Sequence, residues 1–264
     1  FNSIWEMSGG NLNRFMIDTN KIMAKIPISY GPFRGITTGE GFVWVPDVGQ
    51  KKLYQIDPKN NSIVKIYDLP ISNSEGSIAV GAGSVWIAVD SSDGSSRDLK
   101  RIDIKKQEII SSIPLPGSVA GTAFLNNTVW LTSPSTQEVY AVDVDTNKVS
   151  ESIKVGTRPR FIASGGGSIW VLTQGDGAIS KIDLLTKKVT ATIDAKAPGG
   201  GGDITYGEGA VWVSMPGVPV IKVNPETNQL VSQYQGYGMG DAIRAAYGSI
   251  WVSGGKLHRI NVPE

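Results

Sequence analysis

The sequence predicts an all-β protein, a seven-bladed β-propeller of four-stranded antiparallel blades. Three observations predict it: a tryptophan repeat, glycine turns at fixed places in that repeat, and strands that alternate apolar and polar residues. Every tryptophan follows a β-branched residue, and neighbouring tryptophans lie 39 to 44 residues apart. A period near 40 residues is typical of propeller blades. The repeats are centred on Trp5, Trp44, Trp86, Trp130, Trp170, Trp212 and Trp251.

Each repeat contains the same parts in the same order. A short apolar run such as 161–164 comes first, then a glycine turn such as 165–167, then the strand that carries the tryptophan. A third strand such as 179–183 and a fourth such as 63–67 alternate apolar and polar residues, the pattern of half-buried strands. No stretch keeps a helical period, so almost no helix is expected. The tryptophan fills the wedge between neighbouring blades.

The ends of the chain carry incomplete repeats. The first repeat lacks a visible first strand, and the seventh stops before a fourth strand. Seven blades with imperfect end blades is the preferred interpretation. A six-bladed ring is the alternative, and it would leave one tryptophan repeat outside the closure. Because the repeat covers the whole chain, residues 1–264 are predicted to form a single domain.

Carboxylates recur where the third strand ends. Each opens a polar turn, where its side chain can accept backbone N–H groups two residues further on. Asn224 and Asn261 replace the carboxylate in two repeats, which favours a structural role over catalysis. The aspartates expected in this role are Asp18, Asp57, Asp103, Asp143 and Asp183.

The amino-acid composition limits which binding partners and which cellular location are expected. The net charge is +1 without blocks of like charge, so neither nucleic acid nor a membrane surface is expected as a partner. The absence of cysteine excludes disulfides and thiolate chemistry. A cysteine-free, glycine-rich propeller suits an extracytoplasmic location, secreted or periplasmic, and a monomer is expected.

The candidate binding residues lie where the first strands begin. Loops after the fourth and second strands vary most along the chain, and binding in repeat folds concentrates on such a face. Arg34, Arg160 and Asp241 each stand ten residues before a tryptophan, at the expected mouth of the central channel, and Arg244 follows closely. Converging arginines can hold an anionic ligand by bidentate contacts. The alternative is that these charges form salt bridges between neighbouring blades.

Two further features bear on metal binding and catalysis. Asp90 begins a polar loop, 90–98, whose oxygen-rich side chains could ligate a divalent metal, but the loop lacks the spacing of a calcium loop. A solvated loop is preferred, and no cofactor is predicted. The single histidine, His258, cannot form a histidine cluster for zinc, and no nucleophile motif accompanies it. No catalytic residue is therefore assigned.

The repeat unit is similar to those of known propeller families. Gly-x-Gly-Ser-Val-Trp-Val, the x-Ile-Asp-x-x-Thr-x-Lys-Val stretch and the turn at Gly156-Thr157-Arg158-Pro159 resemble YVTN-type β-propeller repeats and the virginiamycin B lyase (streptogramin lyase) family. The second resemblance implies seven blades. It also implies elimination chemistry that opens a cyclic ester antibiotic, with a histidine base, glutamates and a magnesium ion. None of that family's catalytic residues is matched by a motif in this sequence.

The leading functional prediction is a non-enzymatic module that binds a small molecule, peptide or protein on the variable-loop face. The residues expected to line that site are Arg34, Arg160, Asp241, Arg244 and Asp90. The alternative is a metal-assisted lyase or hydrolase of the streptogramin-lyase type, using Asp90, Asp93 or other carboxylates. A third possibility is an architectural module within a larger secreted protein.

Overall fold

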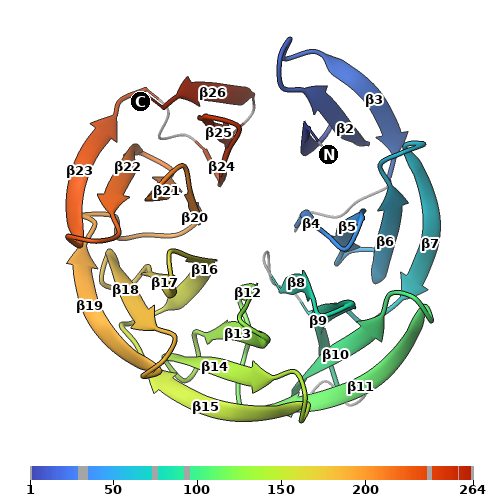
Figure 1. The fold of residues 1–264 in the computed structure, drawn as a ribbon, viewed down its shortest axis with the longest axis horizontal. Helices are drawn as coiled ribbons and strands as arrows, with labels where there is room; N and C mark the ends of the chain where they lie inside the picture. Colours follow the sequence, from blue (N-terminus) through green and yellow to red (C-terminus); the bar gives the residue numbers. More distant parts are fainter. Residues whose placement is uncertain are drawn as a thin grey trace. The chain divides into compact units, whose positions relative to one another are not determined.

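The computed structural model describes residues 2–28, 35–72, 77–91, 96–236, 240–254 and 256–262. Its regular elements in these ranges are 26 β-strands, which form seven sheets in chain order, from blue to red in Figure 1. The fold is an all-β, seven-bladed β-propeller, as the tryptophan period predicted, and the six-bladed alternative is wrong. Among the described residues, no helix has the length and apolar character that crossing a membrane requires.

The chain divides into two compact units. Unit 1 comprises Phe1–Val119 and Val144–Lys148, and unit 2 comprises Ala120–Asp143 and Val149–Glu264. The organisation of residues 1–264 as a single domain stays a prediction.

Unit 1 contains one three-stranded sheet and two four-stranded sheets. The first sheet is built from β1 (Ser3–Ser8), β2 (Asn11–Met16) and β3 (Ile22–Pro27). The second is built from β4 (Thr37–Gly39), β5 (Phe42–Asp47), β6 (Lys52–Asp57) and β7 (Ser62–Asp68). The third is built from β8 (Ile78–Gly81), β9 (Ser84–Asp90), β10 (Arg97–Asp103) and β11 (Glu108–Leu115).

Unit 2 contains the remaining four sheets, of which the last is three-stranded. The fourth sheet is built from β12 (Thr122–Leu125), β13 (Thr128–Ser133), β14 (Glu138–Asp143) and β15 (Lys148–Lys154). The fifth is built from β16 (Pro159–Gly165), β17 (Ser168–Thr173), β18 (Ala178–Asp183) and β19 (Lys188–Asp194). The sixth is built from β20 (Asp203–Gly207), β21 (Ala210–Met215), β22 (Val218–Asn224) and β23 (Gln229–Tyr234). The seventh is built from β24 (Ala242–Ala246), β25 (Ser249–Ser253) and β26 (Leu257–Asn261).

The tryptophan strands form the core between neighbouring sheets. Trp170 packs with Leu172 of its own sheet and with Ile204, Val211 and Val213 of the next sheet. Trp212 packs in the same way on the seventh sheet. Both tryptophans are fully buried, which is the wedge role that the sequence predicted.

A cation faces the tryptophan in five of the seven sheets. In unit 1, Arg101 lies opposite Trp86 in the strand register, with its guanidinium carbon 4.6 Å from the indole centroid. Its Nη1 then donates to the carbonyl of Val144 and to Oδ1 of Asn147 in the turn that follows β14. The five pairs are Trp5 with Arg14, Trp86 with Arg101, Trp170 with Lys181, Trp212 with Lys222 and Trp251 with Arg259. Three of these cations also donate to a backbone carbonyl in a turn: Arg14 to Pro58, Arg101 to Val144 and Lys181 to Pro225. We call a cation that contacts both the indole and such a turn a clasp.

The turn role predicted for the third-strand carboxylates is confirmed at several repeats. Oδ1 of Asp183 accepts the backbone N–H groups of Leu185 and Thr186, and Asp57 and Asp103 make the same kind of bond. The prediction for Asp18 is wrong. Because Ser3 pairs with Met16 as Ser84 pairs with Asp103, Met16 occupies the strand-end position and Asp18 lies two residues beyond it.

Candidate functional site

The first strands of unit 2 bring charged residues from three sheets together. Strands β12, β16, β20 and β24 follow one another side by side (Figure 1). Arg160 is the second residue of β16, Asp203 begins β20, and Asp241 immediately precedes β24. Arg160 and Asp241, which the sequence analysis selected, therefore lie at the two strands that flank β20 in this unit.

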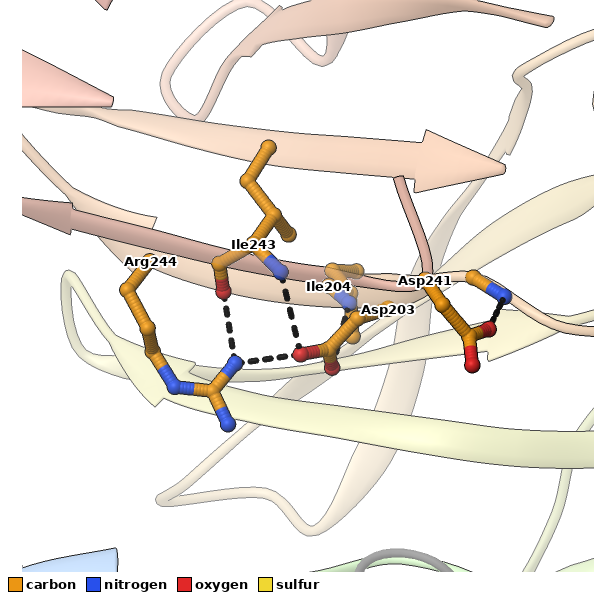
Figure 2. Close-up of polar contacts among 6 residues, drawn as sticks. Asp203, Ile204, Asp241, Ile243 and Arg244 are labelled. Atoms are coloured by element: carbon orange, nitrogen blue, oxygen red, sulfur yellow. Dashed lines mark hydrogen bonds and ion pairs between the residues drawn. The ribbon is translucent and has the colours of Figure 1, made fainter. Parts of the chain in front are cut away.

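Asp203 and Arg244 form an ion pair between β20 and β24. Oδ2 of Asp203 receives Nη1 of Arg244 and also the backbone N–H of Ile243 at 3.3 Å, while Oδ1 receives the N–H of Ile204 at 2.8 Å (Figure 2). The Asp203 side chain is 14% exposed and that of Arg244 is 56% exposed. The carboxylate is thus anchored in the protein while much of the guanidinium faces solvent. This is a salt bridge between neighbouring blades, the alternative role considered for these charges.

Asp241 fixes the end of a glycine-rich loop. Its Oδ1 accepts the backbone N–H of Gly202 at 2.9 Å (Figure 2). Its own N–H donates to the carbonyl of Ser253 at 2.8 Å. Gly202 has φ +87°, and a Cβ there would lie 2.3 Å from the carbonyl oxygen of Ser214. Only glycine fits this position without a shift of backbone. We call Gly201, Gly202, Asp203, Asp241 and Arg244 the first-strand cluster.

Gln174 extends the first-strand cluster toward the fifth sheet, and sequence reasoning missed it. Its Nε2 donates to the carbonyl of Gly201 at 2.6 Å, and its backbone carbonyl accepts the N–H of Gly199 at 3.1 Å. The residue is 1% exposed. The sequence feature that could have indicated Gln174 is its position just after the tryptophan strand β17, where the chain enters a variable loop.

Arg160 lies on the strand beside the first-strand cluster and has its own contacts. Its backbone carbonyl accepts Oγ1–H of Thr132 at 2.7 Å, and the same Oγ1 accepts the N–H of Gly121 at 2.8 Å. The Arg160 guanidinium carbon lies 5.7 Å from the ring centroid of Phe161. The half-buried Arg160 cation therefore belongs to the strand next to β20 and lies beside Phe161.

Asp90 belongs to unit 1 and is paired locally. Its Oδ1 lies 3.0 Å from Nη1 of Arg97 and accepts Oγ–H of Ser72 at 3.0 Å. Both charged side chains are about a third exposed, so this surface pair contributes little to stability. Arg34 and Asp93, which the sequence analysis also selected, lie outside the described residues.

The described residues form no cluster of side chains that could bind a metal ion, and the single histidine lies on the last strand. No group of three or more His, Asp or Glu side chains there could hold a metal ion. His258 lies on β26, opposite Val252 of β25. Catalytic roles for Asp90, or for a divalent metal beside it, stay untested predictions.

Comparison with known proteins shows the fold alone. No protein-family model matches the chain, and no curated protein matches it. One similar solved structure is that of a functionally unknown protein from Desulfotomaculum acetoxidans DSM 771, with a TM-score of 0.69 and 17% sequence identity. The match covers 93% of this chain and 86% of that one. The likeness supports the β-propeller fold and gives no ligand.

Proposed function

We propose that this β-propeller is a non-catalytic binding module whose first-strand cluster holds a carboxylate-bearing small ligand or a peptide. Arg244 is the observation that supports this most directly. Its Nη1 is held by Asp203 and by the Ile243 carbonyl, yet the side chain is 56% exposed. In Figure 2 its other terminal nitrogen points away from Asp203. A guanidinium anchored in this way is pre-oriented to give further N–H bonds to a carboxylate.

The charges around the first-strand cluster limit the chemical classes of ligand that it would bind. Arg160 and Arg244 carry positive charge, and Asp203 and Asp241 carry negative charge. A site with both signs favours a ligand that offers a carboxylate together with hydrogen-bond donors, as a peptide does. It disfavours a polyanion such as nucleic acid, which needs clustered cations. The proposal involves no cofactor and no membrane, and it takes the protein to be an extracytoplasmic monomer.

Titration with succinate tests the proposed function. Succinate should bind the wild-type protein, and Arg244→Ala should weaken binding about tenfold or more, because a charged hydrogen bond contributes about 1.5–3 kcal/mol. Arg160→Ala should weaken binding as well. Isothermal titration calorimetry at low ionic strength measures both effects.

Lys188→Ala is the matched control, because Lys188 is an exposed cation on the outer strand β19. This variant should bind succinate as the wild-type protein does. Equal affinity of Arg244→Ala and Lys188→Ala would contradict the proposal. So would the absence of succinate binding at millimolar concentration.

A further inference from the structure

Gln174 carries a buried acceptor that the fold leaves without a donor. Its Nε2 is committed to the Gly201 carbonyl, which fixes the orientation of the amide. Its Oε1 is fully buried and has no hydrogen-bond partner among the described residues. Because the alternative amide orientation would set Oε1 against the Gly201 carbonyl, turning the amide over cannot relieve this. A buried acceptor without a donor costs about 1–3 kcal/mol, and natural proteins rarely keep one without a reason.

A run of glycines lies against Gln174. The Gly199 N–H donates to the backbone carbonyl of Gln174, and Nε2 of Gln174 donates to the Gly201 carbonyl. Gly200 is exposed, and a Cβ there would meet no heavy atom within 4 Å. A segment without side chains can shift over a few residues at low steric cost. A local shift of this glycine segment would therefore change the surroundings of the Gln174 side chain.

The Gln174 side chain is linked through the glycine run to the proposed ligand site. Gly201 accepts from Gln174, the next residue Gly202 donates to Asp241, and Asp203 follows with its ion pair to Arg244. Movement of the glycine segment would thus open Oε1 beside the same residues that are proposed to hold a carboxylate. An oxygen acceptor next to a carboxylate site is complementary to a ligand with an N–H close to its carboxylate.

We propose that Gln174 Oε1 is a specificity-determining acceptor for an amide N–H, so that the first-strand cluster selects N-acylated amino acids and peptides over carboxylates without that N–H. This proposal rests on the proposed function and adds the class of ligand to it. The occupant it commits to is an amide N–H of the ligand. An ordered water molecule at the same acceptor is the competing outcome, and the test separates the two.

Two dicarboxylates of nearly the same size provide the test. N-acetyl-L-aspartate carries an amide N–H where O-acetyl-L-malate carries an ester oxygen. The wild-type protein should bind the amide about tenfold more tightly, because the ester leaves the buried acceptor unpaired. Calorimetric titration gives both affinities. Equal affinities would overturn the proposal and favour a water molecule at Oε1, and this result needs no variant.

Gln174→Met assigns the selectivity to this side chain. The variant keeps the length of the side chain but removes Oε1, so the ratio of the two affinities should fall to about one. Ser214→Ala is the control, because Ser214 also has a buried hydroxyl without a partner among the described residues, on strand β21 where its backbone pairs with Asp203. It should keep the full ratio. A thermal melt shows that each variant is folded before it is titrated.

The outcomes separate the two proposals. Equal binding of both probes that is lost in Arg244→Ala would contradict the role of Gln174 and leave the carboxylate site standing. A preference for the amide that survives in Gln174→Met would also contradict that role. If neither probe binds at millimolar concentration, the proposed function and the Gln174 inference both fail.

Discussion

Each indole N–H in the core needs an acceptor, because burying this donor without one is costly. In five repeats the indole donates to the carbonyl five residues before it, as Trp130 does to Leu125 at 3.4 Å. The other four pairs are Trp86 with Gly81, Trp170 with Gly165, Trp212 with Gly207 and Trp251 with Ala246. Trp44 has no such bond, and its Nε1 is buried without a partner among the described residues. The same residue type therefore contributes differently in different blades.

Trp44→Phe should destabilise the protein less than Trp130→Phe. Both substitutions leave a cavity, and both tryptophans lack a cation on the opposite strand, where Gln55 and Ala141 stand. Trp44→Phe also removes an unpaired buried donor. The free energy of unfolding of the Trp44→Phe variant should therefore be about 1–2 kcal/mol higher than that of the Trp130→Phe variant. Urea unfolding of the two variants measures the difference. A larger loss for Trp44→Phe would show that its indole has a partner in solution.

The carboxylate of Asp183 makes stability depend on pH. The backbone N–H of Thr186, followed by the Thr186 hydroxyl, lowers the pKa of Asp183 below its ordinary value. The charged form is thus favoured in the folded protein, so its contribution is present above about pH 4 and is lost as the pH falls through the lowered pKa. Asp183→Ala should be less stable than the wild-type protein at neutral pH. The gap should shrink as the pH falls below about 4.

Asp183→Asn is the control for this effect. Asn224 stands at the equivalent position of the sixth sheet, where its Oδ1 accepts the N–H groups of Glu226 and Thr227 at 2.8 and 3.0 Å. An amide therefore supports the same turn without titrating. Unfolding in urea at several pH values measures all three proteins. A gap between wild type and Asp183→Ala that stays constant down to the lowest pH would contradict the role given to the charge.

Within the candidate site, the sequence could predict contacts between residues that lie one repeat apart. Asp203 and Arg244 are separated by 41 residues, close to one repeat, so the repeat period places them on neighbouring first strands. The contact of Gln174 with Gly201 spans 27 residues, which is not a repeat length. It depends on how the glycine loop folds back over the end of β17. No local pattern in the sequence carries that information.

The clasp connects a tryptophan strand to a turn of the next sheet in the chain. Arg101 covers the Trp86 indole, donates from Nε to Oγ of Ser84 and reaches the turn after β14 through Nη1. Arg14 makes the corresponding bonds in the first sheet, to the Pro58 carbonyl and to Oδ1 of Asn61. One side chain thus ties a tryptophan strand to the turn of the following blade. The strand alternation predicted the strands, but the reach of this cation depends on the relative placement of two blades.

Arg101→Ala should lower the free energy of unfolding by about 1–3 kcal/mol, because it removes a cation–π contact and charged hydrogen bonds. Ala141 already occupies this position in the fourth blade, so alanine is compatible with the strand. Lys105→Ala is the control, since Lys105 is an exposed cation in the turn after β10. Equal stability of the two variants in urea unfolding would show that the clasp contributes nothing beyond its charge.

At the scale of the whole molecule, the tryptophan period predicted the number of blades and the incomplete end sheets. Sheets β1–β3 and β24–β26 have three strands each among the described residues, as the missing first and fourth strands implied. This worked because a tryptophan stands on the equivalent strand of every sheet and therefore marks the repeat. Function does not follow from that repeat. It depends on unrepeated residues such as Arg244 and Gln174.

A crystal structure of the protein with bound N-acetyl-L-aspartate tests most directly whether the first-strand cluster binds a carboxylate ligand. We expect a ligand carboxylate within hydrogen-bonding distance of the Arg244 guanidinium, with the Asp203 ion pair retained. We also expect the amide N–H of the ligand at Oε1 of Gln174. A ligand bound elsewhere on the propeller, with Arg244 free of contact to it, would show that the first-strand cluster is not the binding site.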